Sequence, residues 1–140
     1  MIRNRFCFAS FAPIAIGIVL SGFLLVSANA QAPGITAKPL LQTTLSGDDT
    51  KESVIVSVEF AAGSKMWRHT HPGDEYTVVL QGTVELSAEG RETRRVSAGE
   101  AYHIPRGLAH ETQNVGDTPA RIVHVFVVDK GKPILQPVAK

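Results

Sequence analysis

The chain has only one cysteine among its 140 residues. Cys7 lies ahead of an apolar run near the N-terminus, which is not where the cysteine of a lipid anchor lies. A mature chain without this N-terminal segment has no cysteine left, so it forms no intrachain disulfide. For the same reason, a structural zinc site built from thiolates is excluded.

The chain also lacks a marked excess of charge of either sign. It contains 14 lysine and arginine residues against 13 aspartate and glutamate residues. Without Arg3 and Arg5, which lie in the N-terminal segment, the balance is 12 against 13. A chain so close to neutrality gives no indication of a nucleic acid or an anionic surface as its partner.

A long apolar run without any charge lies within residues 1–30. Phe11–Val26 is apolar, follows the two arginines, and ends before the small-residue pattern of Ala28 and Ala30. This order is typical of a signal peptide that is cleaved after Ala30. We therefore expect an exported protein, periplasmic or secreted, without stable membrane association after cleavage. The alternative is an uncleaved membrane anchor, because Phe6–Ala28 is just long enough to span a bilayer.

The sequence after residue 30 shows no helical periodicity. It contains short runs rich in β-branched and aromatic residues, with an alternating pattern in the first of them and turns of Gly, Pro and Asp between them. These runs are residues 54–60, 76–80, 83–88, 92–96, 101–104, 109–115 and 120–128. They predict an all-β sandwich or barrel. We expect residues 31–39, which contain two prolines, to be an extended leader and residues 40–140 to form a single barrel domain.

Two of the five histidines lie one residue apart in the segment HTHPGDE, residues 69–75. In a strand, His69 and His71 point to the same side, where two neutral imidazoles suit a divalent metal. The turn that follows is expected to return Glu75 to the same centre. The best candidate for a further ligand is His110, at the start of a later strand. Such nitrogen and oxygen donors indicate manganese, iron, nickel, copper, cobalt or zinc.

The spacing of these residues forms two patterns. The first is Gly63, five residues, His69-x-His71, three residues, Glu75, six residues and Gly82; the second is Gly99, five residues, Pro105-x-Gly107, two residues, His110, three residues and Asn114. Together they resemble, position for position, the two conserved motifs of the cupin superfamily. The resemblance implies a small jelly-roll barrel, or double-stranded β-helix, with one metal inside. It also implies that His69, His71, Glu75 and His110 are the ligands, whereas we interpret the glycines, Pro105 and Asn114 as structural.

Four protein ligands leave about two open positions in octahedral coordination, for water, dioxygen or a chelating substrate. We therefore expect a metalloenzyme acting on a small oxygenated organic molecule. The resemblance implies dioxygenase-, lyase- or isomerase-type chemistry, and Glu75 is the candidate catalytic residue because no other carboxylate is expected inside the barrel. The alternative is a non-catalytic exported protein that binds a metal or a small ligand. Small cupins commonly pair through sheet edges, so a homodimer is expected, with residues 40–45 as an edge strand.

Several other residues are not expected to bind the metal themselves. His103 is expected to be an exposed or hydrogen-bonded strand residue, and the alternative is a residue that supports a metal ligand. His124 is expected to be a hydrogen-bonded core residue, and the alternative is a residue that lines the pocket. Trp67 should face the interior, where it either lines the substrate pocket or packs in the core. Tyr102 and Met66 are expected in the core. The predicted neighbours of the metal, from strand parity, are Thr77, Val79 and Thr112.

Overall fold

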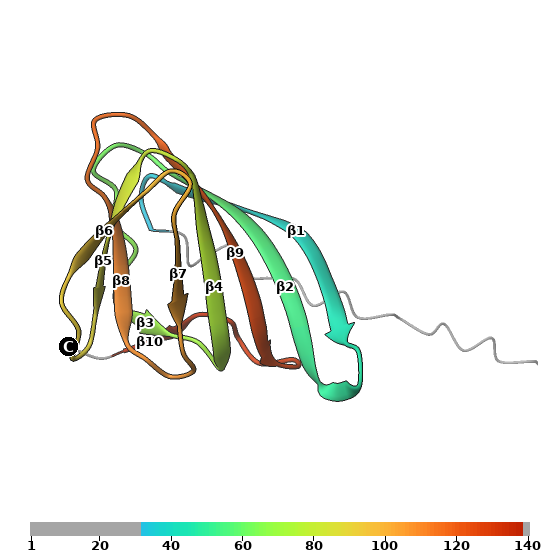
Figure 1. Ribbon diagram of the computed structural model, residues 1–140. Coiled ribbons are helices and arrows are strands. Elements are labelled where there is room, and N and C mark those ends of the chain that lie inside the picture. The colour runs from blue at the N-terminus through green and yellow to red at the C-terminus, as the bar shows by residue number, and fades with distance from the viewer. Residues whose placement is uncertain (1–31, 139–140) are drawn as a thin grey trace, which may run out of the picture.

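The computed structural model describes residues 32–138, which form ten strands and no helix (Figure 1). No helix in this part of the chain is therefore long and apolar enough to cross a membrane. The predicted signal peptide lies outside the described residues. The strands are β1 (Ile35–Leu45), β2 (Asp48–Phe60), β3 (His69–Thr70), β4 (Gly73–Gln81), β5 (Thr83–Ala88), β6 (Arg94–Ser97), β7 (Ala101–Ile104), β8 (His110–Asn114), β9 (Ala120–Asp129) and β10 (Gln136–Pro137).

The strands form two five-stranded antiparallel sheets that face each other. One sheet has the order β1-β2-β9-β4-β7 and the other the order β10-β3-β8-β5-β6. Figure 1 shows β8, β5 and β6 on the opposite side of the barrel from β9, β2 and β1. Strands close in sequence, such as β4 and β5, lie in different sheets, which is the jelly-roll arrangement. The prediction of an all-β jelly-roll barrel is confirmed.

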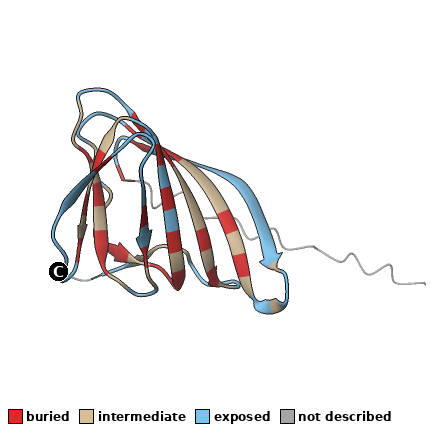
Figure 2. Ribbon diagram, in the orientation of Figure 1, coloured by how far each residue is buried: buried red, intermediate tan, exposed pale blue. Residues whose placement is uncertain are grey.

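The first strand starts earlier than the sequence indicated. β1 begins at Ile35, so residues 35–39 of the predicted leader belong to the barrel and pair with β2. Ile35 is buried and lies opposite Phe60. Pro39 is tolerated because β1 is an edge strand and its register shifts immediately after this proline. Most of β1 is exposed, as Figure 2 shows.

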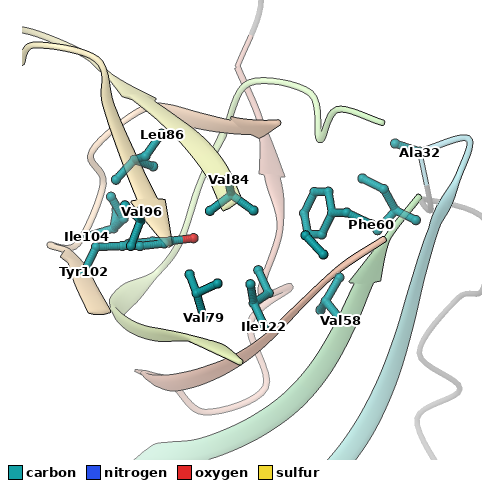
Figure 3. Packing of buried hydrophobic residues seen from close by; sticks show 12 residues of the cluster. Ala32, Val58, Phe60, Val79, Val84, Leu86, Val96, Tyr102, Ile104 and Ile122 are labelled. Carbon is teal, nitrogen blue, oxygen red and sulfur yellow. The ribbon is translucent and has the colours of Figure 1, made fainter. Parts of the chain in front are cut away.

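The barrel interior has an apolar end and a polar end. Figure 3 shows the apolar end, where Val79 of β4 and Ile122 of β9 pack with Phe60 of β2. Further along the same two strands the inward residues become polar: Glu75 and Thr77 precede Val79, and His124 follows Ile122. The remaining buried members of the apolar end are Ala32, Ile35, Val58, Val84, Leu86, Val96, Tyr102, Ile104 and Ala120. The apolar end holds the sheets together, and the polar end positions the site.

Asn114, at the end of β8, joins three segments of the apolar end and is completely buried. Its side-chain nitrogen lies 3.1 Å from the carbonyl oxygens of Phe60 and Ala61 and 2.8 Å from that of Thr118. Its side-chain oxygen accepts a hydrogen bond of 2.9 Å from the amide of Gly116. These contacts satisfy backbone groups that water does not reach, so the structural interpretation of Asn114 is confirmed.

Candidate metal centre

Strand pairing brings the two sequence motifs together. β3 has only two residues, and His69 lies directly opposite His110 of β8. His71 follows β3, and Glu75 is the third residue of β4. The exposed fractions of His69, His71, Glu75 and His110 are 4%, 2%, 1% and 1%. The four predicted ligands therefore lie inside the barrel.

A backbone carbonyl holds each of the three imidazole rings through its Nδ1. Each Nδ1 lies within hydrogen-bond distance of a backbone carbonyl oxygen. The distance is 2.7 Å from His69 to the carbonyl of Trp67, 2.7 Å from His71 to that of Ile134, and 3.0 Å from His110 to that of Leu108. A carbonyl oxygen only accepts, so each Nδ1 carries a proton and, in the neutral ring, Nε2 keeps its lone pair. One potential ligand atom from each ring lies within 4.8 Å of the other two. Three lone pairs can therefore meet at a single metal ion.

Glu75 adds a carboxylate to this cluster. Its Oε2 lies 2.8 Å from Nε2 of His71 and 3.2 Å from Nε2 of His110. Although His71 Nε2 is so close to the carboxylate, it makes no hydrogen bond within residues 32–138. In the neutral ring its lone pair faces the lone pairs of the carboxylate, and a cation between them removes this repulsion. Buried polar atoms seldom lack a partner, so the residues present fit a divalent metal.

The electrostatics of the cluster favour an ionised Glu75 and a neutral His69. Burial by itself raises the pKa of Glu75, but the neighbouring side chains of His124, His110 and His71 hold that pKa well below its usual range. Burial lowers the pKa of His69 to about 3, and the nearby imidazole of His110 adds to this effect. At neutral pH, Glu75 is a carboxylate and His69 a neutral imidazole, which are the forms that bind a metal.

His124 belongs to this cluster as well, which favours the alternative that it lines the pocket over a core histidine. Its Nδ1 lies 2.8 Å from Oε1 of Glu75 and 2.6 Å from the hydroxyl oxygen of Thr77. Thr77 donates its hydroxyl proton to the same Oε1 over 2.6 Å. One carboxylate oxygen of Glu75 is therefore held by Thr77 and His124, and the other faces the three histidines. The register of β4 and β9, with Thr77 opposite His124, brings these residues together.

Glu52 is a second carboxylate inside the barrel, contrary to the expectation that Glu75 is the only one. It has an exposed fraction of 7%. Its side chain points inward because it shares strand parity with Val54 and Val56 of β2. That parity is the signal in the sequence that could have identified it.

The structure places the remaining candidates as follows. His103 is partly exposed and lies 3.0 Å from a carboxylate oxygen of Asp74, as predicted for a surface residue. Trp67 packs against the core and contacts the His69 ring by its edge, with ring centroids 5.3 Å apart. Val79 lies in the apolar core and not beside the centre. Tyr102 is in the core; Met66 packs against the core and also lines the cavity, together with Thr112.

The cluster opens onto a cavity of about 700 Å³. His69, His71, Glu75 and His110 form one part of its wall, and His124 lies beside them. Most of the other lining side chains are apolar and come from β1, β2 and residues 133–135. A cavity of this size with few polar groups suits a small organic molecule.

Residues 56–126, about half of the chain, match the Cupin domain family. A segment of 74 residues is 39% identical to germin-like protein 5-1 of Oryza sativa subsp. japonica, and it covers 49% of this chain and 34% of that protein. The chain therefore spans about a third of the length of this curated relative. The family match runs from β2 to β9 and contains all four predicted ligands.

Two solved structures are similar over most of the chain. The polyketide cyclase RemF from Streptomyces resistomycificus has a TM-score of 0.61 and 26% identity, covering 78% of this chain and 74% of that one. Recombinant oxalate oxidase in complex with glycolate has a TM-score of 0.60 and 28% identity, covering 76% of this chain and 57% of that one. Given this likeness and the family match, the chain belongs to the cupin family.

Proposed function

We propose that this cupin binds one divalent transition metal through His69, His71, His110 and Glu75 and presents it to a small molecule in the cavity. The observation that carries the proposal is the convergence of three buried histidines, each with its Nδ1 on a carbonyl oxygen and one potential ligand atom close to those of the other two. Burying three imidazoles and a carboxylate together is costly unless they bind a cation. A role in packing alone does not account for such an arrangement.

The three imidazoles and the carboxylate limit which metals can bind at this centre. Nitrogen and oxygen donors without a thiolate suit manganese, iron, nickel, copper, cobalt or zinc. Once bound, the metal supplies Lewis-acid or oxygen-activating chemistry at its open positions. The apolar side chains around the cavity exclude bulk water from that point.

We propose further that the protein is an enzyme whose substrate is a small oxygenated organic molecule, with dioxygenase-, lyase- or isomerase-type chemistry. Likeness to an oxalate oxidase solved with glycolate and to a polyketide cyclase supports this substrate class. Glu75 is the proposed catalytic residue. Its Oε1 is fixed by Thr77 and His124 at 2.6 and 2.8 Å. Oε2, which faces the three histidines, would therefore bind the metal and would exchange a proton with the substrate only when released from it.

Turnover by the reconstituted protein tests this function. Metal-dependent oxygen uptake or product formation is expected with at least one of a panel of flavonols, catechols, diketones and small organic acids. Glu75→Gln keeps an oxygen in place but removes the charge, so it should lower turnover more than it lowers metal content. A fully loaded protein that binds panel compounds and converts none of them would instead be a non-catalytic metal- or ligand-binding cupin.

The metal content should be about one ion per chain at neutral pH and should fall in acid. Free imidazoles take up protons near pH 6.5, and a protonated imidazole cannot bind a metal, so release is expected below about pH 6. His69, whose pKa is about 3, stays neutral over this range. Elemental analysis after equilibration between pH 8 and pH 4 measures the release. A metal-free protein after reconstitution with all six candidate metals would contradict the site.

We propose also that residues 1–30 are a signal peptide and that the exported protein forms a homodimer. The apolar run and the small residues before Gln31 support export. The edge strand β1, with Leu40 and Leu41 exposed, supports pairing. Mass spectrometry of the exported protein should find Gln31 at the N-terminus, and light scattering should give twice the mass of the mature chain. An intact Met1 in the soluble protein would contradict the signal peptide. A monomeric mass would contradict the homodimer.

A further inference from the structure

The cavity carries a second polar group, away from the histidines. Gln42 of β1 and Glu52 of β2 line it, as does Lys132 in the turn after β9. None of these residues contacts the proposed metal ligands in the hydrogen bonds or ion pairs of residues 32–138. The proposed roles of the metal ligands and of Glu75 therefore do not explain why Gln42, Glu52 and Lys132 line the cavity.

Glu52 is buried, held in place, and without a cationic partner. Its Oε2 accepts a hydrogen bond of 2.7 Å from the side-chain amide of Gln42, and its Oε1 accepts one of 3.2 Å from the backbone amide of Gly131. Within residues 32–138, no lysine, arginine or histidine nitrogen lies within the 4.0 Å of an ion pair. Lys132 is exposed and does not pair with it. A carboxylate this deeply buried is seldom left without a countercharge.

The strand register gives the separation of Glu52 from the metal centre. Glu75 lies opposite Phe126, and Phe126 lies opposite Val54, so Val54 is two strands away from Glu75. Glu52 lies two residues further along β2. With strands about 4.8 Å apart and a rise of about 3.4 Å per residue, the two backbone positions are about 12 Å apart. The cavity wall between them includes the apolar side chains of Val54, Phe126 and Ile134.

We propose that Gln42 and Glu52 form a second subsite that binds a cationic nitrogen of the ligand, such as a primary ammonium group. An ammonium group supplies the missing countercharge and donates hydrogen bonds to the free lone pairs of Glu52. The ligand then has three parts: oxygen donors at the metal, an apolar body along the wall, and an ammonium group at Glu52. The inference rests on the proposed function, because the oxygen donors require the metal centre.

Paired ligands that differ only in the ammonium group test the subsite. Octanoate and its ω-amino derivative each carry a carboxylate for the metal, and the extended chain of the derivative spans roughly the distance that the register gives. Both are titrated by calorimetry into cobalt-loaded protein at neutral pH, and the cobalt absorption spectrum reports whether the carboxylate reaches the metal. The wild type should bind the ω-amino derivative about tenfold more tightly or better, as expected for a charge-assisted hydrogen bond.

Two variants decide whether Glu52 causes this preference. Glu52→Gln keeps the shape of the side chain and its hydrogen-bonding capacity but removes the charge, so it should bind both ligands with nearly equal affinity while its cobalt content is unchanged. Glu59→Gln makes the same charge change on the same strand at an exposed position, and it should keep the full preference. Lys132→Ala should also keep the preference for the ω-amino derivative, because Lys132 is not part of the proposed subsite.

The outcomes separate the subsite from the function on which it rests. Equal affinities in the wild type, a preference that survives in Glu52→Gln, or one that is lost in Glu59→Gln overturns the subsite, while a shifted cobalt spectrum leaves the metal centre intact. A preference that is lost in Lys132→Ala overturns it as well, because the ligand is then held by a different residue. A fully loaded protein whose spectrum responds to neither acid overturns both the subsite and the proposed presentation of a metal to small molecules.

Discussion

Replacement of His110 by alanine is expected to lower metal affinity by more than about 100-fold. Loss of a residue that only supports a metal ligand typically costs 10- to 100-fold, and His110 is proposed to bind the metal itself. The Nδ1 of His110 is fixed on the carbonyl of Leu108, and its Nε2 lies 3.2 Å from Glu75. No other imidazole of the second motif is available to replace it. Metal analysis of the purified variant after reconstitution and desalting measures the loss.

The matched control is His103→Ala, which removes an imidazole from β7, the strand that precedes β8 in the sequence. His103 lies on the outer surface beside Asp74, so the variant should keep one metal ion per chain. His69→Ala and His71→Ala should resemble His110→Ala, and Glu75→Gln should keep part of the metal. If His103→Ala lost the metal while His110→Ala kept it, the second motif would have indicated the wrong histidine.

Replacement of Gly73 by alanine is expected to prevent folding or to lower the free energy of unfolding by about 3 kcal/mol or more. Gly73 begins β4 directly opposite Val128 of β9. An added Cβ would lie 2.1 Å from the carbonyl oxygen of Val127 and 2.6 Å from the Cα of Val128. These are backbone atoms, so the clash is relieved only if the strands move apart. That movement would also displace Glu75, and urea unfolding measures the change in stability.

A suitable control for Gly73 is Gly47, in the turn between β1 and β2. An added Cβ at Gly47 meets no atom within 4 Å, but the residue has a φ of 85°. Gly47→Ala should therefore lose only the strain of a left-handed conformation, about 1–2 kcal/mol. Equal urea midpoints for Gly73→Ala and the wild type would contradict the packing of β4 on β9.

The sequence predicted most of the fold because local patterns determine it. Alternating residues and regular turns indicated the strands, and the spacing of the two motifs indicated the jelly roll. The start of β1 was placed too late because Pro39 resembles a strand breaker. A proline is compatible with an edge strand, but whether a strand lies at an edge depends on the complete sheet order, which no local pattern reveals.

The candidate site was predicted where the motifs fix it. Their spacing indicated which four side chains lie together, and their roles as ligands stay a prediction. Glu52 was missed and the role of His124 was left open, for different reasons. A glutamate early in a strand is normally exposed, and Glu52 is enclosed by Gln42 and by Gly131, which is distant in sequence. His124 fits the inward parity of β9, but its contact with Glu75 follows from the β4–β9 register.

The central claim is that the three histidines converge on one metal ion. A crystal structure of the metal-loaded protein, with diffraction data on both sides of the absorption edge of that metal, tests it most directly. We expect one anomalous peak per chain inside the barrel, about 2.0–2.2 Å from the Nε2 atoms of His69, His71 and His110. The absence of a peak at this position in a protein that carries one metal ion per chain, or a peak bound through Nδ1 or by other residues, would contradict the account.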